Sequence, residues 1–302
     1  MVEVKEKEGS TVRLPNGIMR LSDEGVERFL VKFKVEKEPY YKECKCADGR
    51  DRNEKKVFEA CLKQKLPLLI KGPTGCGKTR FIEHMAYNTE LPLMTVSCHE
   101  DLTSSALLGM LLPIGDEVHW KDGPLALTAR GGGICYLDEI VEARKDTVVA
   151  IHSLTDHRRQ LTLEKTHELI HTPDDFMLVI TYNPGYQSFV KNLKPSTKQR
   201  FVALEFGYPQ KEDEIEIIKK EGDVDRQTAA KLAEIAQMIR ESKNEIGELD
   251  EAASTRSLVY AARLIVSGIR PKEACSLAII NVITDNAEAQ EGIRDIVEGK
   301  FG

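Results

Sequence analysis

The chain has 302 residues, with 49 acidic and 43 basic side chains and a formal net charge of -6. This length allows one large domain or two smaller ones, and the acidic balance argues against nucleic acid as a partner without excluding a local basic groove. The sequence has no apolar run of the roughly 18–20 residues that a membrane span needs, and its charged first ten residues do not form a signal peptide. We therefore expect a cytoplasmic protein without a membrane span.

The N-terminal part of the chain is polar. We expect an extension over residues 1–38 with a hairpin or a strand, then a helix over 54–65 with one apolar face. Between them, Tyr40 either contacts an adenine ring or packs against the core. Cys44-Lys45-Cys46 is the one close pair among seven cysteines. A structural zinc ion needs four ligands and no histidine lies nearby, so reduced thiols are the preferred interpretation.

A phosphate-binding loop stands between a predicted strand over 66–70 and a predicted helix over 80–86. The loop reads Gly-x-x-x-x-Gly-Lys-Thr. Its glycines let consecutive backbone N–H groups point at phosphate oxygens, and the helix N-terminus adds partial positive charge. We expect Lys78 to reach the β- and γ-phosphates of ATP and the Thr79 hydroxyl to bind Mg²⁺. The expected nucleotide-binding residues of this segment are Gly72, Pro73, Thr74, Gly75, Cys76, Gly77, Lys78, Thr79 and Arg80.

A predicted strand over 92–98 leads into an unusual region, which we interpret as an insert at about 103–130. Its apolar first part is followed by a polar hairpin around 116–125 that returns to a helix. Trp120, the only tryptophan, is either an exposed contact residue on this insert or an ordinary packing residue.

Two acids follow the next apolar strand. Residues 134–137 deliver Asp138 and Glu139 at the carboxyl end of this strand, where open α/β sheets bind ligands. We expect Asp138 to hold Mg²⁺ through water, and Glu139 to orient and polarise the water that attacks ATP. The alternative, a solvated acidic turn, is disfavoured because a phosphate-binding loop lies in the same chain.

A helix is expected over 145–156 and a β-hairpin at about 157–172. The histidines of the hairpin lack acidic or cysteine partners at ligand spacing, so we interpret them as solvated. A buried strand over 175–181 then leads to Asn183. This side chain is expected to hydrogen-bond the attacking water or the γ-phosphate, and the alternative is an ordinary Asn-Pro turn.

Arg200 immediately precedes a predicted fifth strand over 201–206. We expect its guanidinium to enter the site of a neighbouring subunit and to stabilise the charge of the transferring phosphoryl group. A surface salt bridge is the alternative, and Lys198 is the second choice for the same role.

Tyr208-Pro209 marks a boundary, and from residue 211 onward the pattern is helical, with a loop over 247–253. Ser254 is expected to cap the N-terminus of a helix. Arg256 would then point back at the nucleotide phosphates; otherwise it is an exposed arginine in the first turn, where the helix dipole slightly disfavours it.

In chain order, the phosphate-binding loop, Asp138-Glu139, Asn183, Arg200 and Arg256 resemble Walker A, Walker B, sensor 1, the arginine finger and sensor 2 of an AAA+ ATPase. The insert and the later hairpin are similar to those of the MoxR group. Longer runs resemble the CbbQ/NirQ/NorQ family, and these runs are 68–81, 134–146, 182–188 and 194–202.

The resemblance implies an α/β fold: a P-loop AAA+ core with a five-stranded parallel sheet flanked by helices, and a C-terminal all-helical lid. It places the extension at 1–38, the core at 39–208 and the lid at 209–302. It implies a homo-hexameric, Mg²⁺-dependent ATPase, a chaperone that works with a von Willebrand factor A-domain partner. Targets in this family are Rubisco, from which inhibitory sugar phosphates are released, and nitric oxide reductase or the nitrite-reduction machinery. We favour Rubisco, although no residue decides between them.

Two other functions stay open. A DNA-directed motor predicts basic and aromatic loops that face a pore. The insert instead has the acids Asp116, Glu117 and Asp122 beside Lys121, which argues against this function. A nucleotide-gated binding module that needs no turnover is disfavoured by the presence of both Glu139 and a candidate arginine finger.

Overall fold

A computed structural model describes residues 11–44, 52–184, 193–246 and 251–302. Their contacts divide the chain into two compact units. The core unit comprises the described residues of 1–39, 54–71 and 79–205, and the helical unit comprises those of 40–53, 72–78 and 206–302. The phosphate-binding loop is thus grouped with the helical unit, whereas the strand before it belongs to the core unit.

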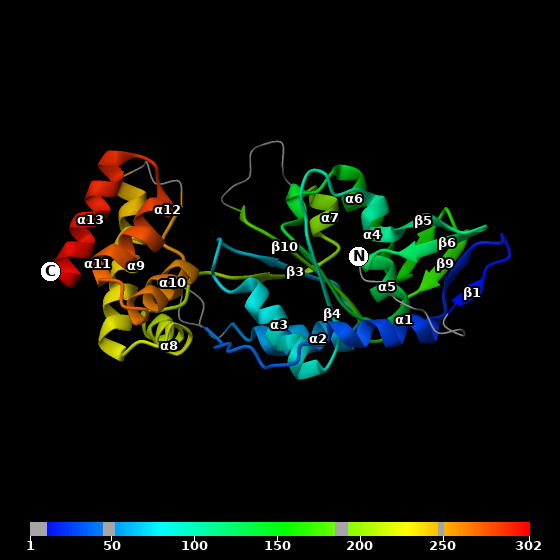
Figure 1. The fold of residues 1–302 in the computed structure, drawn as a ribbon, viewed down its shortest axis with the longest axis horizontal. Helices are drawn as coiled ribbons and strands as arrows, with labels where there is room; N and C mark the ends of the chain where they lie inside the picture. Colours follow the sequence, from blue (N-terminus) through cyan, green and yellow to red (C-terminus); the bar gives the residue numbers. More distant parts are fainter. Residues whose placement is uncertain (1–10, 45–51, 185–192, 247–250) are drawn as a thin grey trace. The chain divides into compact units, whose positions relative to one another are not determined.

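The core unit is built on a parallel sheet with the strand order β11-β3-β10-β7-β4. Figure 1 labels three of its strands, β3, β4 and β10. Its strands are β3 (Leu68–Lys71), β4 (Leu93–Ser97), β7 (Gly133–Asp138), β10 (Phe176–Tyr182) and β11 (Val202–Glu205). β10 is buried along its whole length and β7 along all but its last residue, as expected for parallel strands that are covered on both faces. The five-stranded parallel sheet predicted from the sequence is confirmed.

Helices pack on this sheet through apolar side chains. The helices are α2 (Glu54–Lys63), α3 (Lys78–Thr89), α4 (Ser104–Leu108), α5 (Pro124–Gly131), α6 (Lys145–Ala150) and α7 (Pro195–Lys198), with short 3-10 turns η2 (Ile140–Glu142) and η3 (His152–Leu154). Phe58 of α2 meets Phe81 of α3 edge to face, with ring centroids 5.9 Å apart. The helix predicted over 145–156 is shorter than expected. It ends at Ala150, and a 3-10 turn follows in which Leu154 N–H donates to the Ile151 carbonyl at 3.1 Å.

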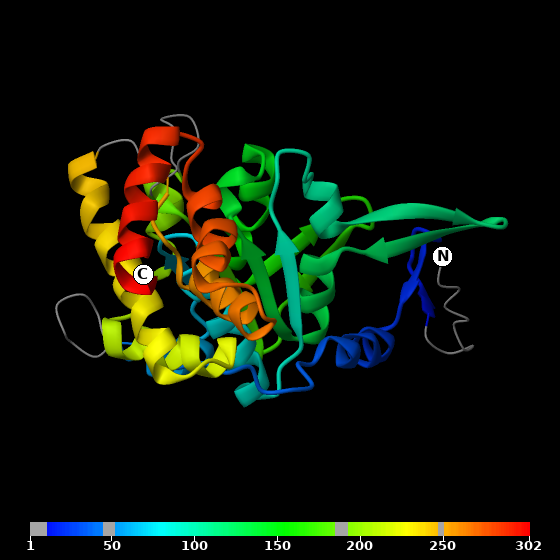
Figure 2. The same cartoon turned by 60° about the vertical axis from the view of Figure 1, so that its left-hand side comes forward.

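A second sheet joins the N-terminal residues to the insert, in the order β1-β2-β6-β5. Its strands are β1 (Thr11–Arg13), β2 (Met19–Leu21), β5 (Gly109–Ile114) and β6 (Glu117–Asp122). β5 and β6 form the predicted hairpin, which Figure 2 shows as a long two-stranded projection. β2 pairs in parallel with β6 and places Arg20 opposite Trp120. β1 and β2 are therefore part of a sheet that the insert completes.

Further elements surround this second sheet. β1 and β2 are antiparallel, as expected for an N-terminal hairpin, and a helix that we did not predict, α1 (Asp23–Leu30), follows with Ser22 as its N-cap. The 3-10 turn η1 (Val31–Phe33) continues it. The hairpin predicted at about 157–172 consists of β8 (Gln160–Leu163) and β9 (Glu168–His171).

Trp120 lies within a buried polar network that connects these elements. Its side chain is 5% exposed, and the indole N–H donates to Asp122 at 2.7 Å. Asp122 also accepts from Arg130 of α5 at 3.3 Å, and Arg130 contacts Glu168 of β9 at 3.3 Å. Glu168 in turn accepts from Arg20 of β2 at 2.8 Å. Packing is therefore the correct alternative for Trp120, and the exposed-contact alternative is wrong, because its polar edge needs Asp122.

The helical unit holds its own apolar core. Its helices are α8 (Lys211–Gly222), α9 (Arg226–Ile246), α10 (Thr255–Val266), α11 (Pro271–Cys275), the π-helix η5 (Ser276–Ile280), α12 (Asn281–Ile283) and α13 (Ala287–Phe301). Ile218, Leu232, Leu258, Ile279 and Ile293 are among its buried side chains. The expected all-helical region is confirmed, since the described part of the chain after residue 206 contains no strand. Across the described residues, no helix has both the length and the apolar character that a bilayer crossing needs.

Candidate nucleotide-binding site

The phosphate-binding loop has the geometry that its sequence predicts. β3 ends at Lys71 and α3 begins at Lys78, so the loop connects a buried strand to the N-terminus of a helix. Gly75 and Gly77 have φ angles of 68° and 98°, which glycine adopts without the penalty that a side chain would add. The strand, loop and helix expected from the motif are therefore present.

The Lys78 side chain folds back over this loop. Its ammonium nitrogen donates to the carbonyl oxygens of Gly72 at 2.9 Å and Pro73 at 2.8 Å. The residue is 8% exposed, so its charge is largely withdrawn from water and is held against the loop. A desolvated and oriented ammonium group at a helix N-terminus suits the binding of phosphate oxygens.

Side chains of the helical unit border the phosphate-binding loop. The Tyr208 hydroxyl donates to the Thr74 carbonyl at 3.2 Å. A Cβ atom on Gly75 would lie 2.7 Å from Ser254 Cβ and 3.2 Å from Arg256 Cβ. Ser254 caps α10 by accepting the backbone N–H three residues further on, as predicted. Arg256 is exposed, and its Cβ atom lies beside the loop. Its contact with the γ-phosphate stays a prediction.

The P-loop cysteine is a packing residue in this structure. Cys76 is 7% exposed, and burial raises the pKa of its thiol, against the opposing effects of Lys78 and Arg52. A protonated, buried thiol is a poor nucleophile. The structure thus favours the view that Cys76 is a small residue that fits the loop over the view that it is redox-sensitive.

In the core unit, hydroxyl groups gather around the last residue of β7. Asp138 Oδ1 accepts the Tyr136 hydroxyl at 2.6 Å and the Thr181 hydroxyl at 2.5 Å. The Tyr136 hydroxyl also lies 3.0 Å from Thr79 Oγ1. Burial, followed by the charge of Asp138, raises the pKa of Tyr136, so its phenol keeps its proton and acts as a donor. The two expected Mg²⁺ ligands, Thr79 and Asp138, are therefore connected through one phenol.

Glu139 directly follows β7 in the left-handed conformation, with φ 55° and ψ 51°. A residue with a side chain costs on the order of 1–3 kcal/mol there, and such strain is typical of functional sites. Two contacts hold it: its backbone N–H donates to Thr181 Oγ1 at 3.0 Å, and its Oε1 accepts from Asn183 Nδ2 at 2.7 Å. The structure brings together Glu139 and Asn183, the two residues that are expected to act on the attacking water.

The candidate arginine finger stands in the segment that follows α7. Arg200 follows α7 and is exposed, as a residue that reaches a neighbouring copy would need to be. Lys198, the second choice, lies over the ring of Tyr182, with Nζ 5.2 Å from the centroid, so it contacts its own subunit. Arg80, in the first turn of α3, is exposed and lies 3.5 Å from the Glu83 carboxylate.

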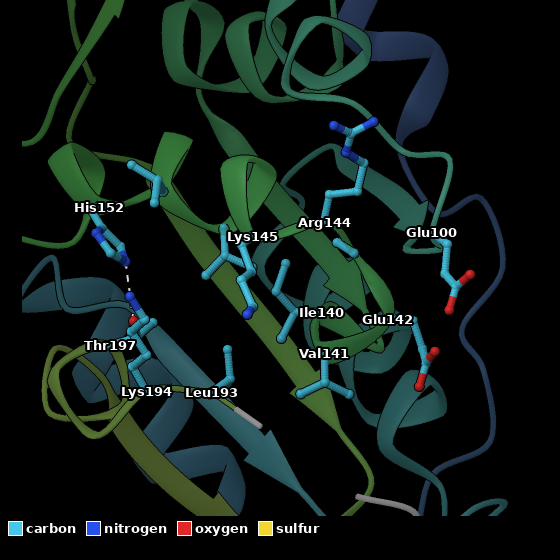
Figure 3. A pocket seen from close by; sticks show the side chains of 13 residues that line it. Glu100, Ile140, Val141, Glu142, Arg144, Lys145, His152, Leu193, Lys194 and Thr197 are labelled. Atoms are coloured by element: carbon cyan, nitrogen blue, oxygen red, sulfur yellow. Dashed lines mark hydrogen bonds between the residues drawn. The ribbon is translucent and has the colours of Figure 1, made fainter. Parts of the chain in front are cut away.

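A cavity of about 340 Å³ opens beside the segment that follows Glu139 (Figure 3). On its wall, His152 Nε2 lies 3.2 Å from Thr197 Oγ1. Burial, and then the charges of Arg200 and Lys194, lower the pKa of His152. The residues that line the cavity are Glu100, Ile140, Val141, Glu142, Ala143, Arg144, Lys145, Val148, Val149, His152, Leu193, Lys194 and Thr197. The cavity thus lies between the acidic end of β7 and the segment that carries Arg200.

Oxygen ligands at the end of β7 suit Mg²⁺. A hydroxyl from Thr79 and a carboxylate from Asp138 are the hard donors that this ion prefers, together with phosphate oxygens and water. Over the described ranges, no group of three or more His, Cys, Asp or Glu residues could hold a metal ion by itself. Cys46 and residues 185–188, which belong to two of the sequence motifs, lie outside the described residues, as do residues 247–250 of the predicted loop.

Two family models match parts of this chain. The model of the AAA domain (dynein-related subfamily) matches residues 67–201, and the model of the CbbQ/NirQ/NorQ C-terminal domain matches residues 214–299. The denitrification regulatory protein NirQ of Pseudomonas aeruginosa is 50% identical over 246 residues, which cover 82% of this chain and 94% of NirQ.

Two further relatives have nearly the same sequence identity to this chain. Protein CbbQ of Hydrogenophilus thermoluteolus is 49% identical over 89% of this chain and 97% of its own length. Protein NorQ of Paracoccus denitrificans is 50% identical over 82% of this chain and 90% of its own length. The chain is therefore an ATPase of the AAA+ class. Within that class, it belongs to the CbbQ/NirQ/NorQ family.

Sequence reasoning missed three hydroxyl groups of this site. Tyr136 lies two residues before Asp138 and shares its side of the strand, which is a signal that the sequence did contain. Thr181 reaches Asp138 because β10 pairs in parallel with β7, with Ile180 opposite Leu137. That register is not visible in the sequence. Tyr208 lies 134 residues from Thr74 in the chain, so no local pattern predicts their contact.

Proposed function

We propose that the chain hydrolyses ATP with Mg²⁺ in order to remodel a target enzyme. Lys78 and the backbone of the phosphate-binding loop bind the phosphates. Thr79 and Asp138 hold the magnesium ion, which neutralises charge on the phosphoryl oxygens. The observation that carries this proposal is the Glu139–Asn183 hydrogen bond at the carboxyl end of the sheet, because it orients a carboxylate where water can be polarised.

The ATPase works as a homo-hexamer in this proposal. Arg200 from one subunit completes the site of the next and stabilises the charge of the transition state, and Arg256 contacts the γ-phosphate from its own subunit. The exposure of Arg200 supports this assignment. Members of the AAA+ class usually form oligomers, and the family relationship extends that expectation to this chain.

Rubisco is the proposed target, and a protein with a von Willebrand factor A domain is the proposed partner. This choice rests on the resemblance to CbbQ-like members of the family, and the identities of 49–50% to CbbQ, NirQ and NorQ favour neither target. In this function the ring uses ATP hydrolysis to release inhibitory sugar phosphates from Rubisco. The assay is the carboxylation rate of sugar phosphate-inhibited Rubisco with ATP, the chain and the partner.

Nitric oxide reductase or the nitrite-reduction machinery is the second candidate target. NorQ and NirQ match this chain as closely as CbbQ does. The discriminating experiment presents tagged chain and partner with inhibited Rubisco and, separately, with inactive nitric oxide reductase, and measures ATP-dependent recovery of each activity. Recovery of reductase activity without recovery of carboxylation would reject the Rubisco proposal.

Both targets require that the chain itself hydrolyses ATP. Wild-type chain should release phosphate only when ATP and Mg²⁺ are both present, and addition of the partner tests for stimulation. A chain that binds ATP but releases no phosphate, with or without partner and target, would instead favour a nucleotide-gated binding module. Salt-dependent binding to DNA with stimulation of hydrolysis would favour a DNA-directed motor.

A further inference from the structure

A continuous chain of hydrogen bonds runs from the phosphate-binding helix to Asn183. It begins at Thr79, passes through the Tyr136 hydroxyl to Asp138 and continues through Thr181 to Glu139. The Asn183 amide closes it on the Glu139 carboxylate. All these residues belong to the core unit. The groups expected to bind Mg²⁺ and the groups expected to act on water are therefore parts of one network.

The direction of these bonds follows from the number of protons available. An ionised Asp138 can only accept, so Tyr136 must use its single proton to donate to Oδ1. The phenol oxygen can then only accept from Thr79, 3.0 Å away. This turns the Thr79 proton toward Tyr136 and leaves the lone pairs of the threonine oxygen for a cation.

Thr181 gives the second half of the network its direction. Its hydroxyl proton goes to Asp138 Oδ1 at 2.5 Å, and its oxygen accepts the Glu139 backbone N–H at 3.0 Å. Only a group that is both donor and acceptor can make this pair of contacts. Both hydroxyls donate to the same oxygen of Asp138, Oδ1, so the carboxylate is oriented through that oxygen and neither hydroxyl engages Oδ2.

We propose that Tyr136 and Thr181 are positioning residues for Mg²⁺: Tyr136 fixes the hydroxyl rotor of Thr79, and both residues orient the Asp138 carboxylate. This inference rests on the proposed function, since it assigns the support of its metal site. Groups that hydrogen-bond to metal ligands typically account for 10–100-fold in metal affinity when they are removed. Neither side chain needs to touch the ion to have this effect.

The experiment uses the full chain and a fluorescent ATP analogue. Its binding is measured first in EDTA and then as Mg²⁺ is added. Tyr136→Phe removes one oxygen atom and keeps the buried ring. We expect its affinity for the nucleotide in EDTA to stay within about twofold of wild type, while the Mg²⁺ concentration at half-effect rises by about 10–100-fold.

Thr181 offers a graded test with a matched control. Thr181→Val should raise the Mg²⁺ requirement in the same way, and Thr181→Ser, which keeps the hydroxyl, should restore it. Thr147→Val is the control, because Thr147 is also fully buried and donates to a backbone oxygen of the core unit, that of Leu102, at 2.7 Å. It should leave the Mg²⁺ requirement unchanged.

The outcomes separate this inference from the proposed function. If Tyr136→Phe has the same Mg²⁺ requirement as wild type, the inference is overturned, while the proposed function, ATP hydrolysis, is not affected. An equal loss of affinity with and without Mg²⁺ would also overturn it, because it would indicate a structural role. Failure of the wild-type chain to bind or hydrolyse the nucleotide would instead reject the proposed function.

Discussion

The side-chain amide of Asn183 donates a hydrogen bond of 2.7 Å to Oε1 of Glu139. Because glutamine offers the same acceptor oxygen, Glu139→Gln should keep this contact while removing the charge that polarises water. We expect ATP hydrolysis to fall by on the order of 10²–10⁴, the usual contribution of a general base. Binding of ATP should change little. Single-turnover hydrolysis and equilibrium binding measure the two quantities separately.

The matched control for this variant is Glu164→Gln. Glu164 is exposed in the turn between β8 and β9, so the same loss of one charge should leave hydrolysis unchanged. Hydrolysis at the wild-type rate in Glu139→Gln would show that Glu139 does not position the water.

The left-handed backbone at Glu139 predicts an unusual order of stability among its variants. Glycine adopts φ 55° without a penalty, whereas alanine carries a Cβ atom that disfavours this region. Glu139→Gly should therefore be more stable than Glu139→Ala by about 1 kcal/mol, although glycine usually destabilises. Urea unfolding of the two variants gives the difference. If alanine were the more stable, the backbone at this position would not be strained.

Because Arg200 is exposed, we expect it to act on ATP that is bound to a neighbouring subunit. Arg200→Ala should lower hydrolysis by on the order of 10³ or more, as when an arginine finger is lost, while ATP binding changes little. Mixing Arg200→Ala with Glu139→Gln should restore part of the activity, because some interfaces then pair an intact Glu139 with an intact Arg200.

Arg158→Ala is the control for the arginine variant. Arg158 is also exposed, and it pairs with Asp156 at 2.6 Å, so its loss should leave hydrolysis unchanged. Absence of any recovery in the mixture, with both variants assembled normally, would place the action of Arg200 within its own subunit.

We expect the free energy of unfolding to decrease in mild acid because of His152. Burial, and then the charges of Arg200 and Lys194, lower its pKa below 6.5 in the folded chain. As the pH falls below about 6.5, the unfolded chain takes up a proton before the folded chain does, so the free energy of unfolding decreases. Above this pH both forms are neutral and the effect vanishes.

Denaturant unfolding of the wild-type chain and of His152→Gln between about pH 7.5 and pH 5.5 measures this contribution. This range of about two pH units spans the ordinary titration of histidine. Glutamine can still hydrogen-bond to Thr197 but does not titrate. As the pH is lowered, the denaturant concentration at the unfolding midpoint should therefore fall more steeply for the wild-type chain than for the variant. Parallel curves would assign the acid sensitivity to other groups.

The sequence predicts the parts of this protein that local patterns determine. The apolar run before the phosphate-binding loop, the glycine spacing within it and the acids after residues 134–137 each lie within one short segment. The parallel sheet is what the resemblance to AAA+ ATPases implies, and the alternation of such strands with helices is consistent with it. These features are all present in the structure.

The contacts between distant segments could not be predicted in the same way. The bond from Thr181 to Asp138 depends on the register of two strands. The burial of Trp120 depends on Arg130 and on residues of other elements that complete its polar network. Alternation along one strand says which side chains share a face, but not which strand lies beside them. This is why the contact of Thr181 with Asp138 emerged only from the structure, whereas the position of Tyr136 two residues before Asp138 was visible in the sequence.

The position of β3 between β11 and β10 constrains how the sheet forms during synthesis. Leu68 pairs with Val179 on one side and with Val202 on the other, so its strand has no sheet neighbour until most of the polypeptide has left the ribosome. Pairing between such distant segments is slow and exposes apolar edges in the meantime. A nascent chain that stops before Val202 cannot complete this sheet, so one edge of β3 stays unpaired until the chain has been extended past that residue.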